Sequence, residues 1–395
     1  MTSLAGTPAL IRLAVRRDRI AIPAWILALT AFTAGSTALW AADLTDPADL
    51  LGEVRVTATS AGIRMLGLAS GPSVGGYAMV RDYLTLAVLA ALMSILAVVR
   101  HTRQGEETGR AELVGAAVVG QHASLAAALA VTVGTNVLLA VALGLGLVAA
   151  GQPVAGSFTA GAAVAAVGLA FAGVAAVTTQ LATSTRGASG LAAAVLGLAF
   201  LFSGVGNLAG HADPAGVRVE SAWPAWLSPI GWGEQMRPFG GDHWWPLLLA
   251  VGVLVGGAAV GAVLIDRRDF GLGLLPQRRG RAGAGRSLRS PSGLAWRLQR
   301  NALLGWGVAM VGFGLVLGGL AGQVEDASGA ARDWYTRMGG SEQILDAYRS
   351  SIMQMAAMAV AVYAVQVLLR MRAEEADGPL EPVLATAVGR IRWAG

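Results

Sequence analysis

Long apolar runs constrain this chain more than any other feature of its sequence. A helix needs about 20 consecutive apolar residues to cross the hydrocarbon core of a bilayer, and the runs show no strand-like alternation that would indicate a lipid-facing barrel. The composition agrees: 55% of residues are hydrophobic and 13% charged, against roughly 25% charged in soluble domains. We predict an all-α polytopic membrane protein with about eight transmembrane helices, at 20–42, 82–99, 123–150, 157–182, 187–210, 243–265, 302–321 and 351–371.

The first run could instead be a signal peptide, because ALWAA at 38–42 loosely resembles a cleavage site. Its apolar stretch is longer than the usual ~7–15 residues of such peptides. We therefore treat this run as the first transmembrane helix.

The distribution of arginine predicts the orientation. All 29 basic residues are arginine, and the bias toward arginine, alanine and glycine suggests a GC-rich bacterial genome. With the N-terminus inside, the cytoplasmic segments hold 21 arginines and 10 acidic residues, and the outer segments hold 8 and 14. This bias follows the positive-inside rule. We expect a multi-pass protein of the bacterial cell membrane with a cytoplasmic N-terminus, whose basic pI reflects topology and contact with anionic lipid rather than with nucleic acid.

Several function classes lack the residues that they need. A Walker A loop places a lysine on the phosphates of ATP, and this sequence contains no lysine. It also contains no cysteine, which excludes disulfides and cysteine metal sites. The four histidines, His101, His122, His211 and His243, have no metal-ligand spacing such as HExxH. We expect no enzyme activity, no cofactor and no metal in the chain itself, and a membrane enzyme is a minor alternative.

A charged segment occurs twice in the sequence. RQGEETGRAELVGAAVVG at 103–120 and RAEEADGPLEPVLATAVG at 372–389 are identical at eight positions without gaps, and each follows the second apolar run of its half. A shorter match joins RRDRIAIPAW at 16–25 to RLQRNALLGW at 297–306. Repetition at corresponding places indicates internal duplication. We predict a first module at 1–265, an Arg/Gly-rich cytoplasmic linker at 266–292 and a partial second module at 293–395.

The repeated segment has the features of a docking element. Gly109 and Gly378 provide backbone freedom for a turn, and Glu112 then falls in the first turn of a short amphipathic helix, where a negative charge is favourable. Such a helix beneath the membrane could enter a groove on a soluble partner. The alternative is a solvated loop whose charges keep it out of the bilayer.

Each half begins with a basic, partly apolar segment that leads to a tryptophan near the start of an apolar run. This arrangement is typical of an in-plane amphipathic helix that leads into a span, although a generic inside-positive flank would look the same. We expect Arg16, Arg19, Arg297 and Arg300 to anchor these leading helices at the inner surface.

The repeated segment also resembles a known coupling motif. EETGRAELVGAAVVG and AEEADGPLEPVLATAVG are similar to the E-E-x-G-x-x-E-x-x-x-A-x-x-x-x-R segment of type-2 ABC exporter permeases. The most similar group is the duplicated permeases of polyketide antibiotic exporters, typified by the tetronasin exporter permease. The resemblance implies a separate ABC ATP-binding subunit that carries ATP and Mg²⁺. It assigns coupling to that ATPase to Glu106, Glu107, Gly109, Glu112, Glu375, Gly378 and Glu381.

A second matching segment lies between the fifth and sixth runs. AWPAWLSPIGWGEQMRPFGGDHWWPLLL at 222–249 interleaves tryptophan with proline. Because tryptophan favours headgroup depth, this pattern predicts a structured interfacial segment on the outer side. It resembles the family segment L-S-P-x-G-W-x-x-x-x-R-P-F-x-x-x-x-W-W, which implies short re-entrant helices that cap the translocation path. The residues that carry this prediction are Trp226, Pro229, Gly231, Trp232, Arg237 and Pro238.

The sequence departs from the family pattern in two places. Pro379 and Pro382 flank Glu381, where the first copy has Arg110 and Leu113, so the two coupling helices would start differently. The sequence ends at RIRWAG, where the resemblance implies a third span of the second module. By this resemblance the chain is C-terminally truncated and lacks about four spans.

The source of energy separates the remaining hypotheses. Charges in the apolar runs are confined to Arg81, Asp82 and Arg370 near their edges, whereas an ion-coupled secondary transporter, the runner-up, needs intramembrane ionisable groups. We therefore expect a permease subunit that expels hydrophobic or amphipathic compounds, such as polyketide antibiotics, with a separate ATPase. A non-functional truncated remnant is the further alternative.

Smaller features of the runs predict how the helices pack. We expect the polar residues to form interhelical hydrogen bonds; they are Asn136, Gln180, Ser203, Asn207, Gln354 and Gln366. GxxxG spacings allow close approach of two helices, and they occur at Gly252/Gly256, Gly257/Gly261 and Gly314/Gly318.

Overall fold

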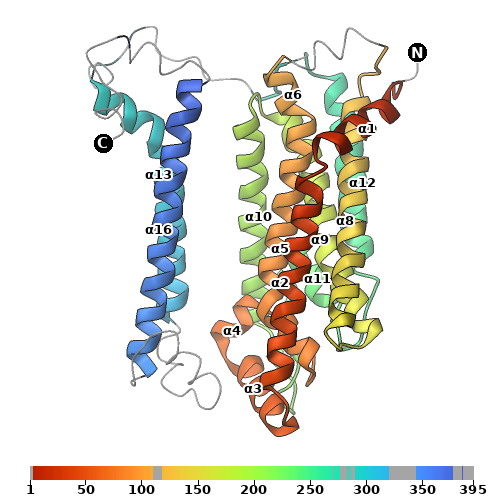
Figure 1. Cartoon of the computed structure of the whole chain (residues 1–395), viewed down its shortest axis with the longest axis vertical. Coiled ribbons are helices and arrows are strands. Elements are labelled where there is room, and N and C mark those ends of the chain that lie inside the picture. The colour runs from red at the N-terminus through yellow and green to blue at the C-terminus, as the bar shows by residue number, and fades with distance from the viewer. Residues whose placement is uncertain are drawn as a thin grey trace. The chain divides into compact units, whose positions relative to one another are not determined.

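Helices form nearly all of the regular structure in the computed structural model (Figure 1). The structure describes residues 3–109, 118–269, 271–275, 290–319 and 344–376, together with 283, 285 and 385. The chain forms two compact units, Met1–Gln277 and Arg278–Gly395, and each is described by itself.

Among the described residues of the first unit, six helices are long and apolar enough to cross a membrane. They are α2 (Ala21–Asp43), α5 (Val74–His101), α8 (Ala123–Ala149), α9 (Val154–Leu181), α10 (Thr185–Leu208) and α12 (Leu247–Asp266). They confirm the all-α polytopic fold and the first six predicted runs. The largest shift is at α5, which begins well before residue 82 because the Ser73 hydroxyl caps it by accepting from the Gly76 N–H at 3.0 Å.

The second unit contains α13 (Pro291–Gly319) and α16 (Ile344–Ala376). They include residues 302–319 of the seventh predicted run and all of the eighth, and residues 320–321 lie outside the described residues. Their described apolar stretches, Ala302–Gly312 and Ile352–Leu368, are shorter than a full span. The Trp306 indole N–H donates to Gln366 Oε1 at 2.8 Å, so the two helices pack against each other.

The two predicted leading helices differ. In the first unit α1 (Thr7–Arg17) is separate from α2, because Asp18 ends it and Pro23 is tolerated only in the first turn of the following helix. In the second unit α13 continues without a break through Arg297 and Arg300, since no proline follows them. The prediction of a separate leading helix there is wrong.

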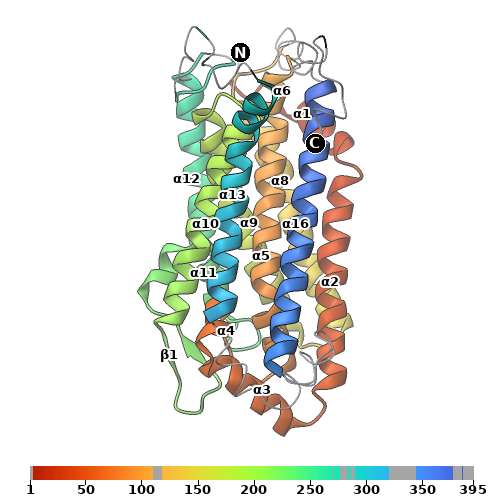
Figure 2. The same cartoon turned by 90° about the vertical axis from the view of Figure 1, so that its left-hand side faces the viewer.

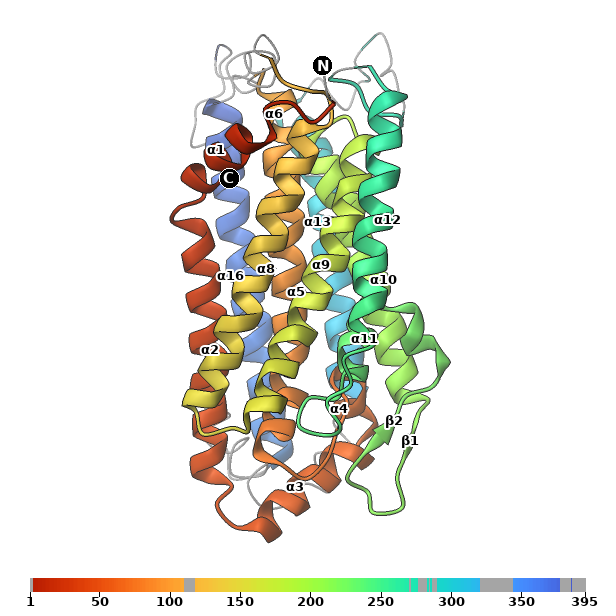
Figure 3. The same cartoon turned by 90° about the vertical axis from the view of Figure 1, so that its right-hand side faces the viewer.

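Short elements that the sequence did not predict lie at the end of the first unit opposite α1 (Figure 2; Figure 3). They include α3 (Pro47–Thr59), which Asp46 caps through the Ala48 N–H at 2.8 Å, and α4 (Ala61–Leu66). The strands β1 (His211–Ala212) and β2 (Val219–Glu220) form an antiparallel pair with His211 opposite Glu220. This end therefore carries a folded cap.

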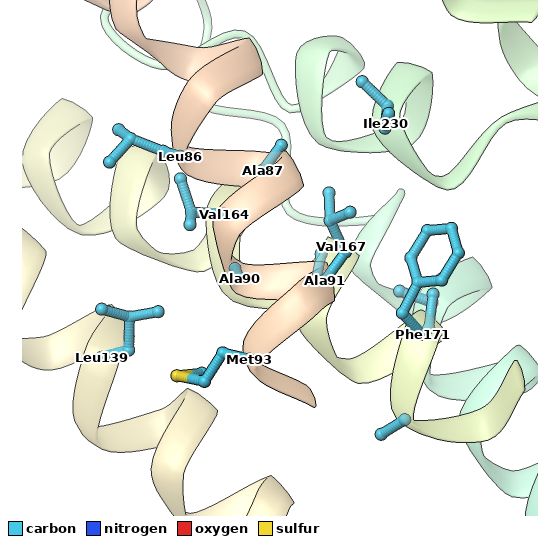
Figure 4. Packing of buried hydrophobic residues seen from close by; sticks show 14 of the residues in the cluster. Leu86, Ala87, Ala90, Ala91, Met93, Leu139, Val164, Val167, Phe171 and Ile230 are labelled. Carbon is cyan, nitrogen blue, oxygen red and sulfur yellow. The ribbon is translucent and has the colours of Figure 1, made fainter. Parts of the chain in front are cut away.

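The core of the first unit surrounds α9. In the most apolar window of this helix 83% of residues are buried, against 11% for α12, so α9 is central and α12 peripheral. Figure 4 shows the packing, with Leu86, Ala90 and Met93 of α5, Leu139 of α8, Val164, Val167 and Phe171 of α9, and Ile230 of α11 (Pro229–Gln235).

Glycine lets α9 and α12 approach at backbone distance. A Cβ at Gly257 would overlap the carbonyl oxygen of Gly173, and a Cβ at Gly261 would lie 3.0 Å from that of Ala176. The Gly257/Gly261 spacing is thus confirmed as a close-approach motif. At Gly252, Gly256, Gly314 and Gly318 a Cβ would meet nothing within 4 Å in the described part of the chain, so these spacings mediate no such contact there.

Candidate functional site

The first copy of the repeated segment follows α5 directly. After Thr102 the chain forms α6 (Arg103–Glu107), which ends in the predicted turn: Gly109 has a φ of 71°, in the left-handed region that favours glycine. Glu112 lies outside the described residues. The first part of the segment is therefore a short helix at the α1 end of the bundle.

Arg103 anchors α6 inside the bundle. Its side chain is only 1% exposed, and it donates to the carbonyl oxygens of Thr179 at 3.0 Å and Leu272 at 3.1 Å. It also donates to Glu106 Oε2 at 2.7 Å, one turn further along the same helix. These bonds join α6 to the end of α9 and to the segment after α12.

Arg268, just beyond α12, completes this network. It donates to both carboxylate oxygens of Glu106, at 2.5 and 2.9 Å, and to Gln180 Oε1 at 2.7 Å. Bidentate pairs of this kind fix geometry as well as charge. The side chains of Glu106 and Arg268 are 11% and 7% exposed, so Glu106, predicted as a coupling residue, faces into the bundle.

Glu107 contacts a different helix. Its Oε2 accepts from the Thr185 N–H at 2.9 Å and from the Thr185 hydroxyl, at the first residue of α10. A carboxylate at a helix N-terminus satisfies a free N–H and interacts favourably with the helix dipole. Glu106 and Glu107 together connect α6 to the ends of α9, α10 and α12.

Further ion pairs cross-link the same end of the bundle. Asp18 at the end of α1 contacts Arg100 at 2.8 Å and His101 Nε2 at 2.6 Å, both in the last turn of α5. His122, before α8, contacts Asp266 at the end of α12 at 2.8 Å. These pairs tie α1 to α5 and α8 to α12, so a force applied at this end would move several helices.

The other predicted residues of this group are less informative. Arg16, Arg19, Arg297 and Arg300 are exposed. Glu375 lies within α16, and Gly378 and Glu381 lie outside the described residues. A coupling role for the second copy stays a prediction.

The predicted outer segment forms two short helices. After η1 (Trp223–Leu227), the Ser228 hydroxyl accepts from the N–H groups of Ile230 and Gly231 and begins α11, whose first residue is Pro229. A Cβ at Gly231 would overlap the Ala225 carbonyl oxygen, so only glycine fits there. The prediction of a structured segment is confirmed.

Tryptophan and a tight turn complete the outer segment. Trp226 stacks on Trp245 with ring centroids 5.1 Å apart, and the Trp232 N–H donates to the Trp226 carbonyl at 2.6 Å. Beyond α11, Arg237 has a φ of 49° and donates to the Val219 carbonyl at 3.1 Å, and Pro238 is buried. The whole segment is therefore fixed against the bundle.

Glu234 of α11 is a buried carboxylate that the sequence reasoning missed. It is 5% exposed, and its Oε2 accepts from Ser203 at 2.6 Å and Asn207 at 2.9 Å, both on α10. Burial raises the pKa of Glu234 to about 7, which these hydrogen bonds only partly offset. A glutamate among tryptophan, proline and glycine was the signal that could have revealed it.

The raised pKa of Glu234 predicts a pH-dependent stability. Because the folded chain binds this proton more tightly than the unfolded chain, the stabilisation is fully present below about pH 4.5 and is lost as the pH rises to about 7. Glu234→Gln keeps an acceptor for Ser203 and Asn207 without ionising, and should flatten this fall. Melting temperatures between about pH 4 and pH 8 test it, with the exposed Glu220→Gln as control; an undiminished fall in Glu234→Gln would contradict the assignment.

Other polar residues act as predicted between helices. Asn136 of α8 donates to the Ser94 hydroxyl of α5 at 2.9 Å, and Gln366 accepts from Trp306. Within the described ranges, no group of three His, Cys, Asp or Glu side chains is arranged to hold a metal ion.

Comparison with known proteins shows where the chain belongs. The family described as "Multidrug efflux system permease Rv1217c, C-terminal domain" matches residues 288–395. The chain is also 37% identical over 402 residues to the multidrug efflux system permease protein Rv1217c of Mycobacterium tuberculosis (strain ATCC 25618 / H37Rv), covering 99% of this chain and 70% of that protein. The chain belongs to the Rv1217c family of multidrug efflux permeases.

Membership in the Rv1217c family confirms the prediction of an exporter permease. A permease is a transport component, and its several membrane-spanning helices make this chain a multi-pass membrane protein. The matched C-terminal domain includes α13 and α16, so the second unit belongs to the same family.

Proposed function

We propose that this permease works with a separate ABC ATP-binding subunit, which carries ATP and Mg²⁺ and docks at the α1 and α6 end of the first unit. That end faces the cytoplasm, in agreement with the arginine distribution. Closure of the ATPase moves the helix ends and expels hydrophobic or amphipathic compounds, such as polyketide antibiotics. Glu112 in the first unit, and separately Glu375, Gly378 and Glu381 in the second, are the further residues through which each unit contacts the ATPase.

The observation that carries this proposal is the Arg103–Glu106–Arg268 network. It fastens α6 to the ends of α9 and α12, while Glu107 fastens α6 to α10. A push on α6 therefore reaches α9 and α12 through short, buried, charge-assisted bonds, and α10 through the exposed contact of Glu107 with Thr185. Glu106 is a positioning residue here, and the exposed Glu107 lies nearer to the partner.

The central helix connects this end to the outer cap. With 28 residues, α9 is about 42 Å long at 1.5 Å per residue. Its inner end accepts from Arg103 at Thr179, and its outer end packs at Gly156 against the ring of Phe239, which follows α11. Motion at α6 is thereby transmitted to the outer segment that caps the path.

An ion-coupled secondary transporter is the second candidate, and Glu234 favours it. Glu234 is a buried carboxylate on the short helix α11, and such a group can bind and release a proton. Efflux from membrane vesicles separates the candidates. Transport that needs ATP and survives collapse of the proton gradient supports the first, and transport driven by a proton gradient without ATP supports the second.

Docking of the ATPase is tested by co-purification. The chain, expressed in membranes with a family-type ATPase subunit, is expected to form a stable complex and to stimulate ATP hydrolysis in detergent. Glu112→Arg should weaken the complex and leave the spans folded. Asp43→Arg makes the same charge change at the outer end of α2 and should have no effect. Failure of the unaltered chain to bind, or equal losses in both variants, would contradict the proposal.

A further inference from the structure

A cavity of about 550 Å³ lies between α1 and the bundle. This volume is within the ~300–1,000 Å³ typical of small-molecule sites. Its walls come from α1, the junction of α5 and α6, the start of α8, the end of α9 and the segment after α12. One wall of the cavity, with Glu106, Arg268 and Gln180, belongs to the coupling network, and the remaining walls do not.

One face of α1 lines the cavity. Leu10, Leu13, Ala14 and Arg17 are spaced i, i+3, i+4 and i+7, which places them on one stripe of a helix. The protein covers this stripe incompletely, since Leu13 is 56% exposed and only Ala14 is buried. An apolar stripe that faces an open cavity has room for an apolar ligand.

The opposite wall is apolar as well. Leu125 of α8 is 4% exposed, and Ile265 of α12 and Val119 also line the cavity. The N-terminal segment before α1 is fixed beside this wall, because the Gly120 N–H donates to the Ala5 carbonyl at 2.9 Å. Two apolar walls held apart in this way suit hydrocarbon chains.

Cationic groups lie at the end of the apolar stripe. Arg17 and Arg100 both line the cavity, and Arg100 meets Asp18 through one terminal nitrogen, which leaves further donors of its five on the guanidinium. The lining holds three arginines, Arg17, Arg100 and Arg268, against two acidic residues, Glu106 and Asp269. Asp18, the partner of Arg100, does not line the cavity. The lining therefore carries a net positive charge and favours an anionic group.

We propose that the cavity binds one anionic phospholipid, with its phosphate against Arg17 and Arg100 and the upper part of its acyl chains between Leu13 and Leu125. The predicted orientation puts this end at the cytoplasmic leaflet, where anionic lipids attract basic segments. The bound lipid fills the space under α1 and holds that helix against α8. Lipid binding at this site can be measured on the permease alone, without the ATPase.

Native mass spectrometry of the full chain in detergent measures such binding directly. Three probes are compared: phosphatidylglycerol, phosphatidylcholine with the same acyl chains, and glycerol 3-phosphate. We expect one phosphatidylglycerol bound at least about fivefold more tightly than phosphatidylcholine, and no retention of glycerol phosphate. Equal binding of the two lipids, or binding of glycerol phosphate as tight as that of the lipid, would overturn the proposal.

Matched variants locate the site. Arg17→Gln should weaken phosphatidylglycerol binding about fivefold, whereas Arg12→Gln removes the same charge from an exposed position of α1 that does not line the cavity and should leave it unchanged. Ser124→Phe fills the cavity and keeps every charge, and should weaken binding of both lipids. Equal losses of phosphatidylglycerol binding in the two arginine variants would mean that the general surface charge attracts the lipid. That result would reject the site.

Discussion

Glu106→Ala is expected to lower the melting temperature of the permease more than any other single change in α6. The substitution leaves the buried guanidinium groups of Arg103 and Arg268 without their shared carboxylate. Removing one partner of a buried ion pair costs about 3–5 kcal/mol, because the remaining charge stays desolvated. Thermal unfolding of the purified chain in detergent measures the loss, and coupling to the ATPase should fail in the same variant.

The neighbouring carboxylate provides the matched control. Glu107 is exposed and contacts only the start of α10 in the described structure, so Glu107→Ala should cost about 1 kcal/mol, the usual value of a helix cap. Both variants remove one negative charge from the same short helix. Equal melting temperatures for the two would show that the Arg103–Glu106–Arg268 network does not stabilise the unit.

Gly257→Ala is expected to separate α12 from α9. The added methyl group would overlap the carbonyl group of Gly173. Because that carbonyl group belongs to the backbone, no side-chain rotation can relieve the contact. Overpacking of this kind costs about 1–3 kcal/mol. The expected result is a lower melting temperature, measured by thermal unfolding in detergent.

Gly256→Ala is the control at the adjacent position of the same helix. A Cβ at Gly256 meets no described atom within 4 Å, and alanine favours a helix over glycine by about 0.5–1 kcal/mol. This variant should unfold at the same temperature as the unaltered chain or slightly above it. A loss in Gly256→Ala as large as in Gly257→Ala would contradict the proposed α9–α12 contact.

Hydropathy predicted the spans well because the thickness of a bilayer dictates helix length, whatever the helix packs against. Hydropathy did not predict which faces of the helices pack against each other. Gly252/Gly256 and Gly257/Gly261 have the same spacing, yet only the second pair lies on the side of α12 that meets α9. The helices α3 and α4 were missed because they are too short to span a bilayer, and their position depends on the cap that they complete.

In the candidate site, too, the sequence predicted individual residues but not the contacts between residues that are far apart in the chain. The charge pattern singled out Glu106 and Glu107, and the i, i+3 spacing of Arg103 and Glu106 was visible in the sequence. The partner that directs Glu106 inward, Arg268, comes 162 residues later and is brought there by the packing of α12 on α9. Glu234 was missed for a similar reason, since Ser203 and Asn207 reach it only through the fold of α11 against α10.

The burial of α9 has a consequence for biosynthesis. This helix leaves the ribosome before α10 and α12, so it enters the bilayer with its glycine and alanine faces against lipid. Its neighbours cover those faces only later, and Arg268 reaches Gln180 and Glu106 last of all, after α12 is complete. Until then α6 is fastened to α9 through Arg103 and to α10 through Glu107, but not to α12. The contacts that Arg268 makes with Gln180 and Glu106 therefore form only after the last span of the unit is in place.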